Sequence, residues 1–284
     1  MPQSKVVTMR ERIAKIITYI VLILTAIYTL APLAFLFVNS FKSHGEIIST
    51  PIGLPSSWDI SYITKAIKAI HFFRALGITI VITVCSVGLI VLVSSLAAWI
   101  MVRNKTKVSN IVLLMFTAAM LIPFQSVMYP LLSLFEKMGL KNVVGLVLMY
   151  GGFGLSMSVF LYHGFIKSVP TSIEEAAVID GANIFQLFFY VVLPLVKSTT
   201  ATVIILNSMW IWNDYLLPFL VIGNSEMKTL TLELYFAKIT SGQYGNPWEL
   251  IFPAVFVSII PIIIIFLYLQ KYIVKGVSDG AVKQ

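Results

Sequence analysis

The 284-residue sequence has little charge, a single cysteine and no phosphate-binding loop motif. Charged residues make up 11% of the chain and hydrophobic residues 58%, whereas a soluble domain carries about 25% charge, so a soluble globular enzyme is excluded. Cys85 alone provides neither a disulfide framework nor a thiolate metal site. The chain has no G-x-x-x-x-G-K-[ST] sequence, so it lacks the usual motif for cradling ATP phosphates.

Five uncharged runs, each of 21 to 28 residues, dominate the sequence instead. A helix needs roughly 20 mostly apolar residues to cross the hydrocarbon core of a bilayer, where it satisfies its backbone amides within its own segment. A sixth span is predicted despite Asp214 and Pro218, because one carboxylate near a helix end costs only a few kcal/mol on insertion scales. We therefore predict an all-α integral membrane protein with one transmembrane domain over residues 1–284. The predicted spans are about 16–41, 75–102, 108–135, 142–166, 198–222 and 250–270.

The net charge of +8 is spread over the segments between spans, which argues against nucleic-acid binding. Six spans put both termini on one side of the membrane. Placing them in the cytoplasm leaves twelve Lys and Arg residues inside and eight outside, as the positive-inside rule favours. Segments 42–74 and 225–249 are then external, and their proline and aromatic content indicates ordered structure. Segment 136–141 becomes a tight external turn.

Segment 167–197, between the fourth and fifth spans, is neither a span nor a flexible connection. Two pairs at its start have the spacing of a capping box, namely Thr171 with Glu174 and Ser172 with Glu175. Gly181 is predicted to end a first helix because glycine adopts the left-handed conformation without a Cβ clash. Asn183 is placed to cap a second helix that runs to Leu193. The sequence thus predicts a cytoplasmic helix-turn-helix over about 170–194.

The first of these two helices has the composition of a docking element. Ala176 and Ala177 give a face without bulk that a partner backbone can approach closely, while Glu174, Glu175 and Asp180 supply charge. A soluble partner that holds this helix can move the membrane helices through the apolar segment that follows it.

The motif itself resembles a known one. Glu175-Ala176-Ala177, three residues, Gly181, nine residues, then Val191, one residue and Leu193-Pro194 is similar to the EAA loop of bacterial ABC-importer permeases. In that family the loop docks into the ATP-binding subunit. The resemblance implies an ATPase-coupling role for Glu174, Glu175, Ala176, Ala177, Asp180, Gly181, Leu193 and Pro194.

The resemblance extends over nearly the whole chain. Residues 207–218, NSMWIWNDYLLP, and the ending QKYIVKGVSDGAVKQ look like the carbohydrate-uptake branch, and specifically like the smaller permease subunit of maltose-type systems. Val191 stands where isoleucine is commoner, and Gln284 ends the chain where glycine does in relatives. The tail of relatives reaches into the ATPase dimer, which implies the same contact for Gly280, Ala281, Val282 and Lys283.

By this resemblance the chain is the non-catalytic permease subunit of a type I ABC importer in a bacterial or archaeal cell membrane. The implied partners are a second homologous permease, two ATP-binding subunits, an extracellular sugar-binding protein and the lipid bilayer. The resemblance implies no cofactor in this chain, and ATP and Mg in the partner ATPase.

Asp214 is the single charged side chain within the predicted spans, and intramembrane carboxylates are candidate functional sites. With Trp210 and Asn213 it offers aromatic, amide and carboxylate groups that suit a sugar. The alternative is a structural role, in which these groups hydrogen-bond neighbouring helices at a gate or at a helix break near Pro218. In the maltose relatives the larger permease supplies most sugar contacts.

Two other functions remain as alternatives. The first is an ion-coupled secondary carrier that works without an ATPase, although the spans lack the charged residues that bind a coupling ion. The second is an ABC permease for a solute other than a sugar.

Overall fold

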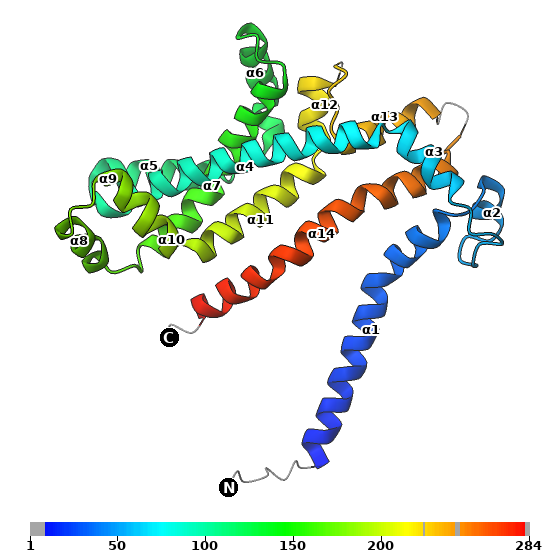
Figure 1. The fold of residues 1–284 in the computed structure, drawn as a ribbon, viewed down its shortest axis with the longest axis horizontal. Helices are drawn as coiled ribbons and strands as arrows, with labels where there is room; N and C mark the ends of the chain where they lie inside the picture. Colours follow the sequence, from blue (N-terminus) through cyan, green and yellow to red (C-terminus); the bar gives the residue numbers. More distant parts are fainter. Residues whose placement is uncertain (1–8, 224, 242–244, 282–284) are drawn as a thin grey trace. The chain divides into compact units, whose positions relative to one another are not determined.

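The structure is a computed structural model that describes the backbone of residues 9–223, 225–241 and 245–281 and, beyond residue 268, the backbone alone. Its regular structure is helical throughout this described part (Figure 1), which confirms the predicted all-α class. The chain falls into two compact units: Met1–Ala69 with Ala237–Val257, and Ile70–Phe236 with Ser258–Gln284.

The helices in chain order are α1 (Met9–Asn39), α2 (His44–Ser49), α3 (Ser61–Ala69), α4 (Phe72–Arg103), α5 (Lys107–Ala119), α6 (Phe124–Lys137), α7 (Val143–Ile166), α8 (Thr171–Ile179), α9 (Ile184–Gln186), the π-helix η1 (Leu187–Val192), α10 (Leu193–Leu195), α11 (Lys197–Asn213), α12 (Leu216–Ile222), α13 (Leu230–Ser241) and α14 (Trp248–Ala281).

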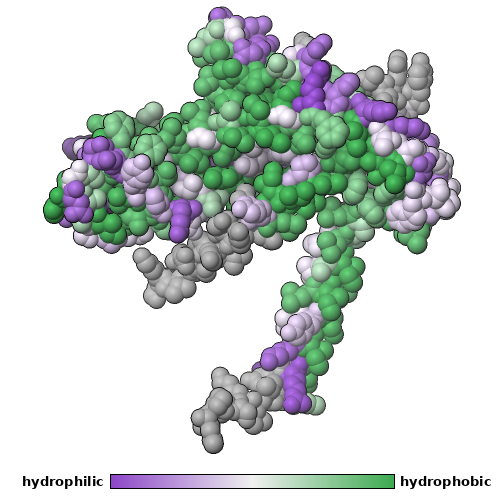
Figure 2. All heavy atoms as spheres, viewed as in Figure 1, coloured by the Kyte–Doolittle hydropathy of each residue, from purple (hydrophilic) through white to green (hydrophobic). Residues whose placement is uncertain are grey.

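Continuous helices cover four of the six predicted spans. Their membrane-crossing parts are long and apolar enough to span a bilayer, and they are Arg12–Asn39, Phe72–Arg103, Val143–Ile166 and Trp248–Tyr268. Hydrophobic side chains cover most of α1 and are exposed in the isolated chain (Figure 2). Such a surface is suited to lipid or to another membrane subunit.

The predicted span 108–135 is made of two helices with a bend between them. α5 and α6 meet at an angle of 105°. Pro123 has no N–H and disfavours helical geometry at Ile122 before it. The chain turns through the bonds Leu121 N–H to Ala118 O and Ile122 N–H to Ala119 O, and α6 begins directly after Pro123.

The predicted span 198–222 is also broken. α11 ends at Asn213, Asp214 has an extended backbone, and α12 begins at Leu216. The break therefore lies at Asp214 rather than at Pro218. Pro218 sits in the first turn of α12, where the missing N–H is tolerated because the first amides of a helix have no partner within it.

The core of the larger unit is the packing of α4 against α7, which run side by side (Figure 1). Two glycines of α7 permit this approach. A Cβ on Gly151 would lie 2.6 Å from Leu89 Cδ2, and one on Gly154 would lie 2.3 Å from Ile90 Cδ1. Glycine at both positions leaves room for the side chains of α4, which a Cβ would force to shift.

In the smaller unit the end of α1 holds the segment that follows it. Lys42 is fully buried and its Nζ donates to the carbonyl oxygens of Thr50 at 2.8 Å and of Pro51 at 3.3 Å. The His44 Nδ1 lies 2.7 Å from Glu249 Oε2 and ties α2 to the start of α14. The segment after α1 is thus ordered.

Candidate coupling loop and substrate cavity

A left-handed glycine forms the corner of the loop between α7 and α11. Gly181 has φ +87°. Its N–H donates to Val178 O, and the Ala182 N–H donates to Ala177 O, both at 3.0 Å. These two bonds make a Schellman motif, which satisfies the last carbonyls of α8 and turns the chain. The predicted end of the first helix at Gly181 is confirmed.

The second helix of the loop starts with a complete capping box. Asn183 Oδ1 accepts from the N–H groups of Phe185 and Gln186, and the Gln186 side chain accepts from the Asn183 N–H at 2.9 Å. The helix continues through η1, where the Leu193 N–H donates to Phe188 O five residues earlier. This wider turn fits Pro194, whose ring would clash with the i−4 carbonyl of a regular α-helix.

Most of the residues predicted to contact the ATPase lie on the surface of this corner. The exposed members of the set are Glu175, Ala176, Asp180, Gly181 and Pro194, and the half-buried ones are Ala177 and Leu193. Two large apolar side chains accompany them, because Ile179 is 85% exposed and Phe185 72%. The corner therefore presents an apolar surface with carboxylates beside it.

Glu174 differs from the rest of the set because it is 8% exposed. Pro170 occupies the N-cap position of α8 without a side-chain cap, so the predicted capping boxes are wrong. The Glu174 carboxylate turns instead toward α4. Its Oε2 accepts from Trp99 Nε1 at 3.0 Å, and its Oε1 accepts from Arg103 Nε at 2.9 Å and Nη2 at 2.5 Å.

Sequence reasoning missed the two partners of Glu174. Trp99 and Arg103 are four residues apart and so share one face of the last turn of α4. Their signal in the sequence is that Arg103 is the first charge after the uncharged run 75–102. A charge at the end of a span is ordinarily assigned to the membrane surface, and its partner 71 positions later has no periodicity to reveal it.

Asp214 is bonded on both carboxylate oxygens. Oδ2 accepts from the Tyr150 hydroxyl at 3.0 Å, and Oδ1 accepts at 2.9 Å from the N–H of Leu216, the first residue of α12, which makes an Asx turn before that helix. The Asp214 carbonyl accepts from Thr231 Oγ1 at 2.8 Å. Asn213 is exposed and donates to Met209 O in its own helix. These contacts correspond to the structural alternative, a helix break held by hydrogen bonds.

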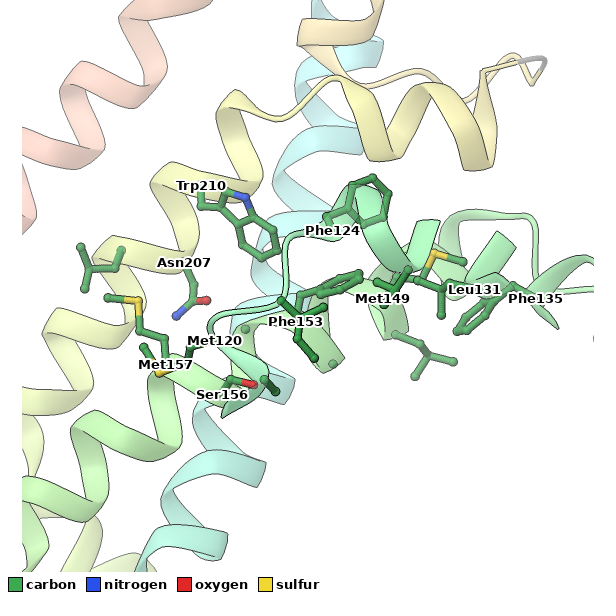
Figure 3. A pocket seen from close by; sticks show the side chains of 17 residues that line it. Met120, Phe124, Leu131, Phe135, Met149, Phe153, Ser156, Met157, Asn207 and Trp210 are labelled. Atoms are coloured by element: carbon green, nitrogen blue, oxygen red, sulfur yellow. The ribbon is translucent and has the colours of Figure 1, made fainter. Parts of the chain in front are cut away.

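A cavity of about 700 Å³ lies where the α5–α6 corner meets α7 and α11 (Figure 3). Trp210 lines it, with the rings of Phe124 and Phe153 and the polar groups of Asn207 and Ser156 among the other lining side chains. Asn213 and Asp214 do not belong to the lining. Of the three residues predicted for the substrate pathway, only Trp210 therefore lines this cavity.

Trp210 is nevertheless linked to Asp214 through a shared neighbour. The Trp210 and Tyr150 rings are in edge contact with centroids 5.4 Å apart, and Tyr150 is the hydroxyl donor to Asp214. The break between α11 and α12 therefore fixes one wall of the cavity.

Of the predicted tail contacts, Gly280 and Ala281 form the last residues of α14, while Val282 and Lys283 lie outside the described residues. Among the residues that the structure describes, no three His, Cys, Asp or Glu side chains are grouped so as to hold a metal ion.

The family model of the binding-protein-dependent transport system inner membrane component matches residues 90–279. The chain belongs to this family. It is 39% identical over 269 residues to the "Probable starch degradation products transport system permease protein AmyC" of Thermoanaerobacterium thermosulfurigenes, with 95% of this chain and 97% of the relative covered. It is 35% identical over 280 residues to the multiple sugar-binding transport system permease MsmG of Streptococcus mutans, with 96% and 99% covered.

Two further comparisons agree. The melibiose/raffinose/stachyose import permease MelC of Bacillus subtilis is 31% identical over 278 residues, which cover 96% of this chain and 98% of the relative. The crystal structure of a bacterial ABC transporter involved in the import of the acidic polysaccharide alginate contains a chain with the same fold. Its TM-score is 0.77 at 23% identity, with 96% of this chain and 99% of that chain covered.

Family membership makes this chain a multi-pass inner membrane permease subunit of an ABC importer, with a transport role rather than a catalytic one. The predicted resemblance to carbohydrate-uptake permeases is confirmed. Importers of this class combine permeases with an ATPase and a binding protein.

Proposed function

We propose that this permease imports a sugar and forms the translocation pathway together with a second, homologous permease. Three relatives that align over nearly their whole length carry names that refer to starch degradation products, multiple sugars, or melibiose, raffinose and stachyose. ATP and Mg are bound in two partner ATPase subunits, and the motor is a separate polypeptide because this sequence has no phosphate-loop motif.

The observation that carries the proposal is the surface of the α8–α9 corner. Glu175 and Ala176 are exposed on α8, and Ile179 and Phe185 project beside them. An exposed apolar patch rimmed by charge marks a protein interaction site. We place the ATPase contact on this surface, with Glu175 rather than the buried Glu174 as its carboxylate.

The transport mechanism needs no chemistry in this subunit. ATP binding closes the ATPase pair, which moves the two docked loops together and turns the helix bundles from inward-facing to outward-facing, and hydrolysis resets them. Energy enters as differential stabilisation of two conformations.

The cavity at the α5–α6 corner is the proposed substrate path. Trp210, Phe124 and Phe153 offer aromatic faces for the C–H surface of a sugar, and Asn207 and Ser156 offer polar groups for its hydroxyls. Asp214 acts indirectly, by holding the wall from which Trp210 projects.

We assign the external surface to segments 42–74 and 225–249, which receive the sugar-binding protein. Both termini are then cytoplasmic, as the distribution of Lys and Arg favours. The C-terminal tail, 280–283, is proposed as a second and smaller ATPase contact.

Docking is tested by purifying the tagged chain from its native host in mild detergent and identifying the bound proteins by mass spectrometry. The expected partners are an ATPase and a second permease. Glu175→Lys and Gly181→Leu should abolish ATPase binding while membrane insertion persists. Glu136→Lys is the matched control, because Glu136 is an exposed carboxylate in the last turn of α6 and makes a 3.8 Å pair with Lys141. Normal ATPase binding by both loop variants would refute the docking role.

Transport is tested in proteoliposomes that contain the purified complex and its binding protein, with radiolabelled maltotriose and raffinose as probes. ATP-dependent accumulation of either sugar supports the proposal. Accumulation by this chain alone, driven by an ion gradient, would favour the secondary carrier. A complex whose binding protein takes neither sugar but another class of solute would favour the non-sugar permease.

A further inference from the structure

The buried carboxylate of α8 is held by one face of α4. Trp99 and Arg103 direct three N–H groups at Glu174, and Arg103 Nη2 also donates to Val169 O at 3.2 Å. The side chains of Arg103 and Glu174 retain 21% and 10% of their exposure. The planar guanidinium and the indole thus fix both oxygens of one carboxylate.

The same turn of α4 also touches the second half of the loop. The Trp99 ring lies 5.6 Å from the Phe188 ring of η1, centroid to centroid, and Phe188 is 2% exposed. Val169 precedes α8, Glu174 lies within it and Phe188 follows it. One turn of α4 therefore contacts the loop before, within and after its docking helix, α8.

These contacts make movement of α8 relative to α4 energetically unfavourable. Separating a buried carboxylate from its guanidinium leaves two uncompensated charges in a medium of low dielectric constant, which is far more unfavourable than breaking an exposed pair. α4 in turn packs along α7. A displacement of α8 that keeps the ion pair intact must therefore carry the inner end of α4 with it.

We propose that Glu174, Trp99 and Arg103 form a joint that makes α8 and α4 move as one body when the ATPase displaces the loop. The inference rests on the proposed coupling function and assigns different roles to the adjacent residues Glu174 and Glu175. Glu175 faces outward to the ATPase, and Glu174 faces inward as a positioning residue that passes the movement to α4.

The test measures the separation of α8 and α4 during the nucleotide cycle. One spin label is placed on Cys85, the native cysteine of α4, which is exposed in this chain, and the other on Val178→Cys, an exposed position of α8. The distance is measured by pulsed electron paramagnetic resonance in the complete complex with its ATPase, without nucleotide and with ATP plus vanadate.

The joint predicts one narrow distance in the labelled parent that is the same in both states. Glu174→Ala should give a broader distribution, or a mean that shifts between the two states, while the ATPase still co-purifies. Arg103→Lys, which keeps the charge but loses the planar fork, should lie between them. Glu136→Gln, which changes the exposed pair between the last turn of α6 and Lys141, should match the parent.

Two results would overturn the joint: a parent distance that changes with nucleotide, or a Glu174→Ala distribution identical to that of the parent in both states. If Glu174→Ala does not reach the membrane, Arg103→Lys and Glu174→Gln decide by the same readout. Failure of the coupling function itself gives a different result, namely a parent chain that carries no ATPase at all.

Discussion

Two carboxylates of the larger unit, Glu174 within α8 and Asp214 between α11 and α12, are held in different ways. Glu174 accepts from an indole and from a guanidinium, so its charge is matched by a cation. Asp214 accepts from the Tyr150 hydroxyl and from a backbone N–H, which are neutral donors. The loop site is therefore an ion pair, whereas the α11–α12 break is an Asx turn held by neutral hydrogen bonds.

Because of this difference, we expect substitutions at the two sites to change the stability of the chain by different amounts. At an ion pair, removal of one partner leaves a buried charge, which costs more than a lost neutral hydrogen bond. At an Asx turn, Asn can supply the side-chain oxygen as well as Asp. We expect the loop to depend on charge and the break to depend on hydrogen-bond geometry.

Removal of the cation should have the largest effect. Arg103→Leu leaves Glu174 buried and unpaired, and we expect the free energy of unfolding to fall by about 3 to 5 kcal/mol. Chemical unfolding in detergent measures this change. Tyr150→Phe is the counterpart at Asp214, where loss of one neutral donor should cost about 1 to 3 kcal/mol. Equal losses in the two variants would remove the distinction between the sites.

Added side-chain volume should lower the stability more at the contact between α4 and α7 than in the loop. Gly154→Val places atoms where Ile90 Cδ1 and Asn207 Oδ1 already lie, 2.3 and 2.7 Å from the new Cβ, and should destabilise the chain by about 1 to 3 kcal/mol.

Gly181→Ala is the counterpart in the loop. Its Cβ meets nothing within 4 Å, so its cost of about 1 kcal/mol arises from the positive φ alone. Thermal unfolding ranks the two variants, and a larger loss for Gly181→Ala would show that α4 and α7 can separate to admit a side chain. Gly164→Ala, with no atom near its Cβ and an ordinary φ, is the control.

The sequence predicted local features better than pairings between distant segments. The corner at Gly181 and the cap at Asn183 follow from residue types within a few positions, and the structure contains both. Long apolar runs predicted where helices lie, but a run does not record a bend, since Leu121 and Ile122 are as apolar in a turn as in a helix. Pro123 was the local signal for the bend between α5 and α6.

The role of Glu174 could not be read from its neighbours. Its spacing from Thr171 satisfies a capping box, yet Pro170 takes the N-cap position of α8 and the Glu174 carboxylate bonds to Arg103 instead. The bond between Tyr150 and Asp214 joins residues 64 positions apart. Pairings of this kind depend on how helices pack, which periodicity does not determine.

Neutralising the second carboxylate tests the comparison most directly. Asp214→Asn keeps an oxygen for the Leu216 N–H and offers Tyr150 an amide donor in place of an acceptor, so we expect a loss below about 1 kcal/mol. Transport of the sugar that the parent imports should persist. Loss of transport with unchanged stability would indicate instead that Asp214 contacts the substrate directly.

Glu46, in the smaller unit, extends the comparison to a carboxylate that is only half-buried. Its Oε1 accepts from the Ser56 Oγ at 2.7 Å and from the Ser56 N–H at 2.6 Å, and these bonds lower the pKa of Glu46 below its usual 4.5. Because the folded-state pKa is the lower one, the contribution to stability is complete above pH 4.5 and is lost as the pH falls through the folded-state pKa.

Ser56→Ala removes the hydroxyl donor, so the pKa of Glu46 should rise toward its usual value. Hydrogen exchange of the segment from α2 to Ser56, followed by mass spectrometry, compares this variant with the parent at matched pH. The variant should exchange slightly faster at pH 7, and the difference should vanish once Glu46 is protonated in both proteins. The effect should be the smallest of the four predictions, because solvent reaches this half-buried carboxylate, screens its charge and competes for its hydrogen bonds. A difference as large as that of Arg103→Leu, or one that grows in acid, would mean that burial is not what separates the strong carboxylate contacts of this chain from the weak ones.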